Sequence, residues 1–445
     1  MRGVVVALGK IGLPVAVQLA RTAEDVIGCD IDARVCELVN AGQAPWAGEA
    51  GLAEALAELV PAGRLRAQTD TTDALSAGPD LAIAVPPLAL DDTGQIDYGA
   101  LDAVVEDIGR GLQAGTTVSF ETTLPVGTTR ERIGPRLAEL SGLRPEEDFF
   151  VVFSPERVSA GRIFADLASY PKLVGGIGPA SEARGVELYG AFLPAEVRAM
   201  GSSEAAELTK LAETTYRDVN IALANEFARF ADRAGIDLDR VIDAANSQPY
   251  SHLHRPGVAV GGHCIPVYPR LYLSGDPAAT IPAAARAVNE SMPAYAVQLL
   301  AGALGDLRGR RVLILGVAYR GGVPESAFSG AFGLRDELLA AGAVPLVADP
   351  LFDPAALAAE GFAAWAGEDI DGAIVQTDHA EYRDLRPADL PGVTAVVDGR
   401  GVLDAAAFAA AGIAVQAIGR PGVDQRSGSS ASSAATTRSP ARPSP

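Results

Sequence analysis

Short apolar runs alternate with longer stretches of helical periodicity along most of the chain. The first apolar run covers residues 3–8 and leads into a helical pattern that ends near Ala20. Apolar runs of this length are typical of strands buried on both faces of a parallel sheet. The pattern therefore predicts an α/β protein with two doubly wound, Rossmann-like parallel sheets. Further strands are expected at 25–28, 81–85, 117–121, 150–153 and 172–176 with a helix at 98–112, and in the second sheet at 311–315, 344–348, 373–376, 395–398 and 414–417.

A segment without proline or glycine separates the two sets of strands. Residues 202–234 keep helical periodicity throughout, which predicts one long helix in a central helical region. Ser202 or Ser203 is expected to cap this helix, and Glu204 and Glu207 lie in its first turns, where acidic side chains suit the helix dipole. Its apolar stripes are formed by Leu208, Leu211, Val219, Leu223 and Phe227.

One face of the long helix carries Lys210, Thr214 and Arg217 at helical spacing. Lysine is scarce in this chain, which has only Lys10, Lys172 and Lys210 among its 36 basic residues. Both a solvated charged face and a functional lysine fit this pattern. Lys210 is therefore a candidate for the functional site.

The order of the patterns predicts three domains and a tail. A chain of 445 residues is longer than a single domain with one hydrophobic core usually is. A helical stretch at 281–304 leads into the polar sequence GDLRGR, where the last domain is expected to begin. The serine-rich end cannot bury an apolar core and is expected to be disordered. The expected boundaries are 1–200 for the first Rossmann domain, 201–305 for the helical domain, 306–423 for the second Rossmann-like domain and 424–445 for the tail.

A formal net charge of −20 limits the expected partners. Nucleic acid and anionic membranes select basic surfaces, so neither is expected to bind. No apolar run reaches membrane-spanning length, and the sequence begins directly with a strand pattern, which favours the cytoplasm. Three widely spaced cysteines indicate a reducing compartment rather than a disulfide framework.

The sequence ALGKIGLP after the first strand nearly fits the GxGxxG pattern of dinucleotide-binding turns. Ala7, Gly9 and Gly12 occupy the motif positions, so alanine replaces the first glycine. Asp30 ends the second apolar run, where a carboxylate could hold the ribose 2′-hydroxyl. This carboxylate would repel a 2′-phosphate, which favours NAD over NADP, although Arg34 could meet such a phosphate. The alternative is a βαβ unit whose glycines only ease helix packing.

Cys264 lies in the segment RPGVAVGGHCIPVYPR. The glycines of this segment let its backbone approach a ligand closely, and Pro266 and Pro269 stiffen the end of the loop after the cysteine. The segment is therefore predicted to be a rigid loop that presents the sulfur. Cys29 ends an apolar run and Cys36 lies inside a helical pattern, and both are expected to be small buried hydrophobes. A loop cysteine by itself can equally be inert, because reactivity depends on the thiolate.

Two further polar side chains follow expected strands. Thr123 lies in ETTLPVGTT and Glu156 in SPERVSAGR, each at the carboxyl end of a strand, where ligands of parallel sheets bind. Each has an ordinary alternative, a turn hydroxyl for Thr123 and a helix N-terminal charge for Glu156.

Together these segments resemble the UDP-glucose/GDP-mannose dehydrogenase family over nearly the whole chain. The matching motifs are ALGKIGLP, ETTLPVGTT, SPERVSAGR, SSEAAELTK, NIALANE, GGHCIPVYP, AYRGG, TDHAEY and VVDGRGVLD. The sequence motifs SPER and YRDVNIALANE are most similar to those of the branch that acts on UDP-N-acetylhexosamines, UDP-N-acetylmannosamine in particular. The resemblance implies NAD-dependent, four-electron oxidation of a nucleotide-sugar C6 alcohol to the uronate, with UDP-glucose as the alternative substrate. It also implies a UDP-sugar held by the C-terminal domain, a long helix that builds a homodimer or higher oligomer, and no metal.

The resemblance assigns roles residue by residue. Cys264 would attack the aldehyde, and Lys210 would stabilise oxyanions. Glu156 would assist proton transfer and thioester hydrolysis, Thr123 would position water or hydroxyl, and Thr214 would lie beside them. The cofactor would be bound by Gly9, Ile11, Gly12, Asp30, Pro86 and Thr123. The substrate would be bound by Arg157, Val158, Lys210, Arg217, Gly261, Tyr319, Arg320 and Arg400.

Four positions depart from the family's pattern. Thr214 stands where asparagine is usual, and Tyr268 stands where an aspartate usually follows the cysteine by four residues. Ala327 replaces an arginine, and Pro87 replaces a threonine of the cofactor loop. With Ala7, these departures motivate a rival hypothesis, a catalytically silent nucleotide-binding or scaffold protein. The retained candidate catalytic residues favour a distinct subgroup of enzymes.

Overall fold

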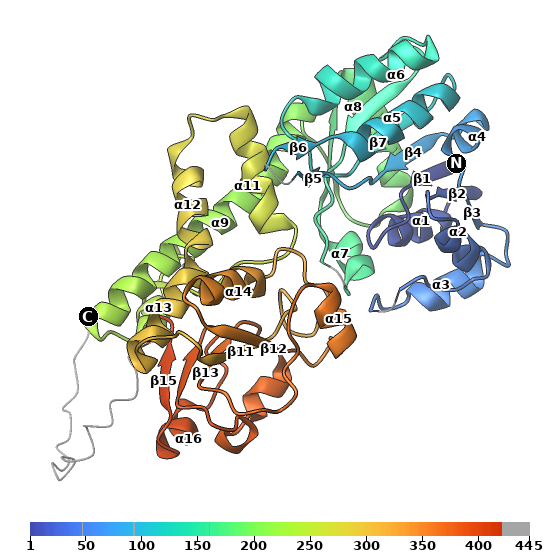
Figure 1. The fold of residues 1–445 in the computed structure, drawn as a ribbon. Helices are drawn as coiled ribbons and strands as arrows, with labels where there is room; N and C mark the ends of the chain where they lie inside the picture. The colour runs from blue at the N-terminus through green and yellow to red at the C-terminus, as the bar shows by residue number, and fades with distance from the viewer. Residues whose placement is uncertain (47, 92–93, 160, 421–445) are drawn as a thin grey trace, which may run out of the picture. The chain divides into compact units, whose positions relative to one another are not determined.

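The apolar runs fold into buried strands of two sheets, which confirms the predicted α/β class (Figure 1). The computed structural model describes residues 1–420 apart from 47, 92–93 and 160, so the expected tail at 424–445 lies outside the described residues. The chain divides into two compact units, each with one large sheet. Unit 1 comprises Met1–Asp218 and Cys264–Ala283, and unit 2 comprises Val219–His263 and the residues from Ala284 onward.

Unit 1 is built on an eight-stranded sheet in the order β10-β9-β8-β7-β4-β1-β2-β3. The chain forms β1, β2 and β3 in one direction and then returns to the other side of β1 with β4. Ligands of such sheets bind beyond the carboxyl ends of the strands at this reversal. The strands are β1 (Arg2–Val6), β2 (Asp25–Cys29), β3 (Leu65–Gln68), β4 (Leu81–Ala84), β7 (Thr117–Phe120), β8 (Phe150–Phe153), β9 (Lys172–Gly176) and β10 (Val197–Ala199).

Three features of unit 1 differ from the prediction. β8 and β9 pair antiparallel, with Val152 opposite Gly176, whereas the other pairs of this sheet are parallel. The edge strands β3 and β10 carry polar residues and were not predicted from the apolar pattern. A separate hairpin pairs β5 (Ala89–Leu90) with β6 (Ile96–Asp97). Such short pairs leave no periodic signal in a sequence.

Helices cover both faces of this sheet. One face packs through Val5, Val26 and Val174 against α1 (Gly12–Ala20), α2 (Ala33–Asn40), α3 (Leu52–Leu59), α7 (Ile163–Ser169) and α8 (Pro179–Phe192). The other face packs through Val4, Ala82 and Val118 against α4 (Thr71–Ser76), α5 (Gly99–Gly111) and α6 (Gly134–Ser141), the last preceded by the π-helical turn η1 (Thr129–Ile133). These two layers are the arrangement that the unbroken apolar strands require.

Unit 2 contains a five-stranded parallel sheet in the order β12-β11-β13-β14-β15. Its strands are β11 (Arg311–Leu315), β12 (Val344–Ala348), β13 (Gly372–Val375), β14 (Ala395–Asp398) and β15 (Ala414–Ala417), close to the predicted runs. The other elements from residue 235 onward are α10 (Leu238–Ala245), α11 (Cys264–Gly275, in unit 1), α12 (Thr280–Glu290), α13 (Met292–Leu304), α14 (Gly330–Ala340), α15 (Pro354–Ala359), α16 (Ala405–Ala410) and the 3₁₀ turns η2 (Ala380–Asp384) and η3 (Pro387–Asp389).

The predicted long helix is α9 (Ser203–Ala234), 32 residues in length. The hydroxyl oxygen of Ser202 accepts the N–H of Ala205 at 3.1 Å, which confirms Ser202 as the cap. The stretch predicted as helical at 281–304 is instead two helices, α12 and α13, that meet at Ser291. Pro293 lies in the first turn of α13, where its missing N–H breaks no hydrogen bond, whereas the same proline inside one continuous helix would remove one.

No helix among the described residues combines the length and the apolar character needed to cross a membrane.

Candidate active site

The turn between β1 and α1 has the close packing of a dinucleotide-binding loop. A side chain at Gly12 would place its Cβ 1.9 Å from the carbonyl oxygen of Ala7, so only glycine fits there. Around Gly9, by contrast, the same Cβ would meet no atom within 4 Å, which leaves space for a ligand. Ala7 itself has φ +71°, a conformation that glycine adopts more easily. Lys10 is exposed in this loop.

Asp30 lies directly after β2, as predicted, and its carboxylate organises the same turn. One carboxylate oxygen accepts the N–H of Leu8 at 2.8 Å, and the other accepts the N–H of Asp32 at 2.9 Å. An acidic side chain at this place in the sheet suits a ribose hydroxyl. The loop and the acid together fit a dinucleotide.

The loops after β4 and β7 lie side by side. Thr122 donates its hydroxyl to the carbonyl oxygen of Pro86 at 2.5 Å, which ties the predicted cofactor residue Pro86 to the segment that contains Thr123. Thr123 is buried, with 4% of its surface exposed. Both loops follow strands next to the reversal of the sheet, where the ligand is expected.

Cys264 is the first residue of α11, whereas the sequence predicted a rigid loop through Arg270. Pro266 falls in the first turn of the helix, where the missing N–H costs nothing, and Pro269 lies inside the helix. The thiol of Cys264 is exposed, while Cys29 and Cys36 are buried as predicted. A thiol at a helix N-terminus lies close to the positive end of the helix dipole.

Lys210 reaches the same region from α9. Its ammonium group donates a hydrogen bond to the carbonyl oxygen of Glu156. Burial lowers the pKa of Lys210, and the nearby Cys264, Glu156 and Glu213 partly offset this effect. Unit 1 therefore brings together a thiol and a partly buried ammonium group that the sequence places 54 residues apart.

Tyr268 lies one helical turn after Cys264 and completes the cluster. Burial together with the neighbouring Cys264 thiol raises the pKa of Tyr268, and Thr123 acts in the opposite direction. The Lys210 ammonium lies 5.9 Å from the centre of the Tyr268 ring. A residue that departs from the family's pattern thus lies near the candidate catalytic residues Cys264, Thr123 and Lys210.

A buried ionic network supports Glu156. The Lys172 ammonium lies 2.9 Å from a carboxylate oxygen of Glu121 and 3.7 Å from one of Glu156. Tyr189 donates its hydroxyl to the other oxygen of Glu121 at 2.5 Å. Burial raises the pKa of Glu121, and Lys172 opposes this effect. Lys172 therefore connects a predicted catalytic carboxylate to a second carboxylate that the sequence did not single out.

Three of the remaining predicted residues of unit 1, Arg157, Val158 and Thr214, have partners within the protein. Arg157 forms an ion pair with Glu213 of α9 at 2.5 Å. The N–H of Val158 donates to the Glu156 carboxylate at 2.7 Å, so Glu156 faces its own loop and not a helix N-terminus. The Thr214 hydroxyl donates to carbonyl oxygens one turn earlier in α9, each at 3.1 Å. Arg217 is exposed on the same helix.

Glu207 anchors the loop that follows Thr123. Its carboxylate accepts the N–H of Gly127 at 2.6 Å, and it accepts both the N–H and the hydroxyl of Thr129, at 2.9 and 2.6 Å. Burial raises the pKa of Glu207 to about 7, although these hydrogen bonds act in the opposite direction. The sequence indicated only a favourable charge in the first turns of the helix, and the structure shows a link between α9 and the β7 loop.

We expect Glu207 to lower the free energy of unfolding as the pH rises from about 4.5 to about 7. An unfolded glutamate ionises near 4.5, whereas the folded protein keeps this proton until about pH 7. Between these values the native state binds more protons, so rising pH favours unfolding, by about 3 kcal/mol in total. Urea unfolding of the wild type and Glu207→Gln at pH 5 and pH 8 measures the effect. An equal pH dependence of the two proteins would contradict it.

Unit 2 gathers the other predicted substrate residues around residues 257–263. A Cβ on Gly261 would lie 2.7 Å from the Cβ of Tyr319, and Gly262, with φ +81°, lies against the Tyr319 ring. The Arg400 guanidinium donates to the carbonyl oxygens of Gln376 at 2.6 Å and Ala259 at 3.2 Å. Burial lowers the pKa of Arg400. Arg320 lies with its guanidinium 5.8 Å from the Tyr319 ring centre.

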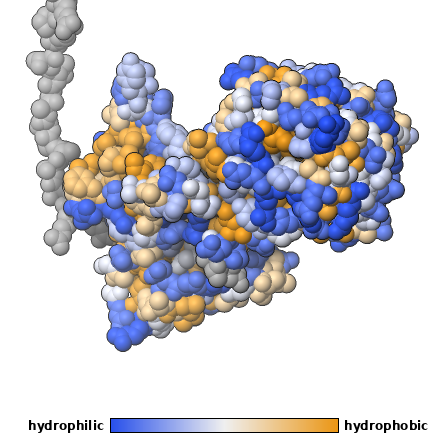
Figure 2. All heavy atoms as spheres, turned by 90° about the horizontal axis from the view of Figure 1, so that it is seen from above, coloured by the Kyte–Doolittle hydropathy of each residue, from blue (hydrophilic) through white to orange (hydrophobic). Residues whose placement is uncertain are grey.

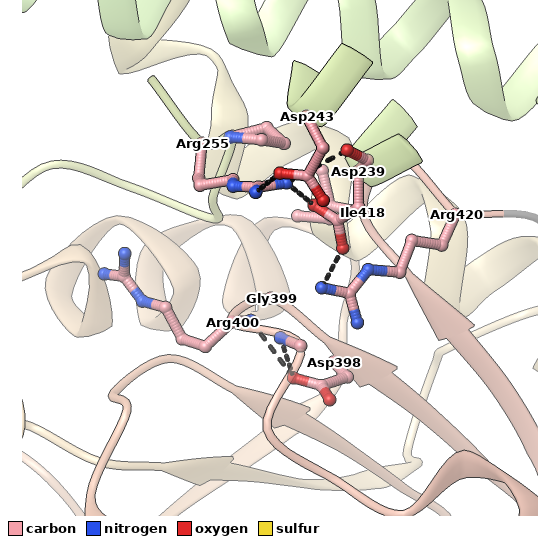
Figure 3. Close-up of a pocket in the computed structure, with 10 residues that line it drawn as sticks. Asp239, Asp243, Arg255, Asp398, Gly399, Arg400, Ile418 and Arg420 are labelled. Carbon is pink, nitrogen blue, oxygen red and sulfur yellow. Dashed lines mark hydrogen bonds and ion pairs between the residues drawn. The ribbon is translucent and has the colours of Figure 1, made fainter. Parts of the chain in front are cut away.

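A pocket of about 290 Å³ opens in unit 2 beyond the carboxyl ends of β14 and β15 (Figure 3). Arg255 and Arg420 point into it, and both pair with Asp239. Asp398 accepts the N–H groups of Arg400 and Gly401 at 3.1 and 2.7 Å, and the Arg400 side chain points away from the aspartates. Neither Arg255 nor Arg420 was assigned to a site from the sequence. All ten residues that line this pocket belong to unit 2.

A dinucleotide-binding sheet, followed by a central helical segment and a second Rossmann-like sheet, fits a dinucleotide-dependent oxidoreductase. The chain belongs to the UDP-glucose/GDP-mannose dehydrogenase family, whose NAD binding domain matches residues 1–193, central domain 204–291 and UDP binding domain 313–405. It is a nucleotide-sugar dehydrogenase of this family, which confirms the resemblance seen in the sequence.

Several relatives are similar over almost the whole chain. A UDP-N-acetyl-D-mannosamine dehydrogenase of Pyrococcus horikoshii is 35% identical over 391 residues, 86% of this chain and 91% of that protein. One of Methanocaldococcus jannaschii is 30% identical over 90% of this chain and 91% of its own length. The solved structure of UDP-D-ManNAc dehydrogenase from Pyrococcus horikoshii has a TM-score of 0.84 at 31% identity, covering 94% of this chain and 99% of that one. A UDP-glucose dehydrogenase from Pyrobaculum islandicum has a TM-score of 0.80 at 28% identity, covering 94% and 98%.

Proposed function

We propose that this protein oxidises the C6 alcohol of UDP-N-acetyl-D-mannosamine to the uronate, with two NAD⁺ consumed per sugar. The observation that carries the proposal is the cluster of Cys264, Lys210, Tyr268 and Thr123 in the unit that holds the dinucleotide-binding sheet. The names of the similar proteins support the choice of sugar. Bound NAD⁺ would supply a two-electron acceptor for each of the two oxidations.

Cys264 allows the reaction to proceed beyond the aldehyde. An aldehyde has no hydroxyl to oxidise until a nucleophile adds to its carbonyl carbon. In the proposed step the Cys264 thiolate adds to this carbon and forms a thiohemiacetal, and the second oxidation converts it into a thioester. Water then breaks the bond between carbon and sulfur, which releases the carboxylate and returns the thiol. The exposed thiol at the start of α11 suits this role.

The groups around the thiol would serve the charges and protons of these steps. The Lys210 ammonium would stabilise the oxyanion that forms when sulfur or water adds to the carbonyl. Glu156, held by Lys172, would accept a proton from the attacking water. Thr123 would orient the hydroxyl or the water from the carboxyl end of β7, and Thr214 would support Lys210 from within α9.

The other predicted residues would bind the two nucleotides. Backbone groups of the cofactor loops would hold NAD⁺, and Arg157, Val158 and Arg217 of unit 1 would line the path of the sugar. Unit 2 would hold the uridine diphosphate part through Gly261, Tyr319, Arg320 and Arg400. The cofactor residues are Gly9, Ile11, Gly12, Asp30, Pro86 and Thr123.

NADH formation with a panel of nucleotide sugars tests this proposal. UDP-N-acetyl-D-mannosamine should give the highest kcat/KM, and two NADH should form for each sugar oxidised. UDP-glucose is the second candidate substrate, because a solved UDP-glucose dehydrogenase has nearly the same fold as this chain. Equal or better turnover of UDP-glucose would overturn the choice of sugar. No NADH with any member of the panel would favour the silent scaffold.

Asp30 is expected to set the choice between NAD⁺ and NADP⁺. Its carboxylate can accept hydrogen bonds from the ribose hydroxyls and repels a 2′-phosphate, so kcat/KM should be higher with NAD⁺. Asp30→Ala should lower kcat/KM for NAD⁺ by about 10- to 100-fold. It should also bring the kcat/KM values for NAD⁺ and NADP⁺ closer together. Asp30→Asn, which keeps an acceptor for the N–H of Leu8, separates the charge from the support of the turn. Equal wild-type kcat/KM values for the two cofactors would contradict this role.

We also propose that the protein forms a homodimer or a higher homo-oligomer through α9 and its neighbours. Hydrophobic residues are visible on the surface of the molecule (Figure 2). Several large ones lie on α9, where Leu223, Phe227 and Phe230 are 40%, 39% and 59% exposed. Contiguous apolar surface of this kind marks an interface. Light scattering of the wild type and Phe230→Asp tests this proposal, and a monomeric wild type would overturn it.

A further inference from the structure

Three neighbouring strands of unit 2, β12, β11 and β13, are parallel and therefore end at the same edge of the sheet. The segment AYRGG (318–322, the AYRGG loop) follows β11 and carries Tyr319 and Arg320. Asp349 is the first residue after β12, and His379 lies four residues after the end of β13. The side chains of Asp349 and His379 are 0% and 1% exposed. Two buried polar side chains thus follow the strands on either side of the one that leads into the loop.

The Asp349 carboxylate holds the start of the AYRGG loop. One of its oxygens accepts the N–H groups of Val317 and Ala318 at 2.7 and 2.9 Å, and the other accepts the N–H of Leu351 at 2.8 Å. Burial acts to raise the pKa of Asp349, but the hydrogen bonds from His379 and from these N–H groups lower it overall. The charged carboxylate is therefore stabilised by the donors around it.

His379 extends this support to the end of the loop. Its Nε2 lies 3.1 Å from the Asp349 oxygen that binds Val317 and Ala318, and its Nδ1 accepts the N–H of Gly322 at 3.3 Å. A backbone N–H can only donate, so Nδ1 must accept, and the ring proton lies on Nε2, which donates it to Asp349. The imidazole ring thus connects the carboxylate at the start of the loop to Gly322 at its end.

The glycines of the loop fit it closely against the segment that carries His379. Gly321 donates its N–H to the Asp378 carboxylate at 2.8 Å, and a Cβ on Gly321 would lie 2.4 Å from the Asp378 carbonyl oxygen. Gly322 has φ +74°, a conformation that glycine adopts readily. Two adjacent glycines also have wide conformational freedom, so the shape of the loop depends on the bonds that fix it.

We propose that His379 is a positioning residue that holds the AYRGG loop in the conformation that binds the nucleotide sugar. His379 acts through Tyr319 and Arg320 and touches neither the sugar nor the reacting atoms. The inference rests on the proposed function, because that function assigns these two residues to the substrate. A loop that takes the binding conformation only part of the time binds with an affinity reduced by that fraction. Loss of the bond to Gly322 should therefore weaken nucleotide binding and leave the chemical steps unchanged.

Two substitutions of His379 separate its two hydrogen bonds. His379→Asn keeps an acceptor oxygen at the place of Nδ1 for Gly322 but is too short to reach Asp349. His379→Gln keeps an N–H at the place of Nε2 for Asp349 but has carbon at the place of Nδ1. Tyr382→Phe is the matched control, because its ring lies edge to face with His379 at 5.4 Å and its hydroxyl donates to the Ala348 carbonyl oxygen at 3.1 Å. This control removes a neighbouring hydrogen bond and keeps the one to Gly322.

Calorimetric titration of the full-length protein with UDP measures the effect on binding. His379→Gln should raise the Kd for UDP about tenfold, whereas His379→Asn and Tyr382→Phe should stay within about twofold of the wild type. KM for the nucleotide sugar should rise in His379→Gln by the same factor, while kcat and KM for NAD⁺ stay close to the wild-type values. A purely structural role would instead lower the thermal stability of all three variants and leave the Kd unchanged.

Hydrogen–deuterium exchange of the free protein tests the loop itself. The peptide that covers residues 316–324 should exchange faster in His379→Gln than in the wild type, and Tyr382→Phe should match the wild type. Unchanged exchange in His379→Gln overturns the inference, as does an unchanged Kd or an equal rise of the Kd in Tyr382→Phe. A wild type that binds no UDP would refute the proposed substrate, and the exchange rates alone would then decide whether His379 holds the loop.

Discussion

Cys264→Ala is expected to abolish the formation of uronate, with a loss of kcat on the order of 10⁴-fold or more. Without sulfur, the aldehyde has no nucleophile on the protein and must wait for hydration by water. The first oxidation needs only a positioned alcohol, an acceptor and a group that takes the proton, so it can still occur. We therefore expect traces of one NADH per sugar in place of rapid formation of two.

Binding and turnover together decide this prediction. Isothermal titration calorimetry should show that Cys264→Ala still binds NAD⁺ and the nucleotide sugar. The reason is that the thiol contributes to the reaction and not to the binding of either molecule. Cys36→Ala removes a buried thiol of α2 and serves as the matched control, with kcat close to that of the wild type. Uronate production by Cys264→Ala at near wild-type rate, with two NADH per sugar, would refute the proposed mechanism.

Lys172→Met is expected to reduce the free energy of unfolding by about 3–5 kcal/mol. The side chain of Lys172 is only 7% exposed and lies between the carboxylates of Glu121 and Glu156. Methionine keeps most of the volume but leaves two carboxylates next to each other in a buried site. We expect kcat to fall as well, because Glu156 loses the cation that holds it.

A double variant and an exposed control make this test specific. Lys172→Met combined with Glu121→Gln removes a charge of each sign and should recover most of the lost stability, as a double-mutant cycle in urea unfolding would measure. Arg110→Met removes the exposed ion pairs to Glu106 and Asp107 and should cost less than about 1 kcal/mol. If Lys172→Met cost no more than Arg110→Met, the buried network would not stabilise the fold.

The sequence predicted the strands better than the contacts between side chains. Runs such as those of β8 and β11 are apolar throughout, and burial on both faces of a parallel sheet leaves few other structures for them. The helix that begins at Cys264 was missed, because Pro266 and Pro269 suggested a loop, and proline at the start of a helix gives the same signal. The short hairpin of β5 and β6 has no periodicity to detect.

The candidate site was only partly predictable for a related reason. Motifs identified Cys264, Lys210 and Thr123, but the pairing of Lys172 with Glu121 joins residues 51 positions apart and depends on how β7 and β9 place them. The scarcity of lysine was a usable signal, since it distinguishes Lys172 from the many arginines of the chain. The position of Tyr268 near Cys264 and Lys210 depends on the face of α11 that it occupies, and an expected loop has no such face.

The placement of the lysines has a practical consequence for chemical labelling. Lys172 is buried and Lys210 is partly buried in contact with Glu156, whereas Lys10 is exposed in the turn that follows β1. An amine-selective reagent used to immobilise or fluorescently tag the enzyme would therefore concentrate at Lys10, apart from the α-amino group. A surface prepared in this way would present the protein with a linker on the loop that we propose for NAD⁺. Conjugation through an introduced cysteine faces the opposite difficulty, because maleimide would also reach Cys264.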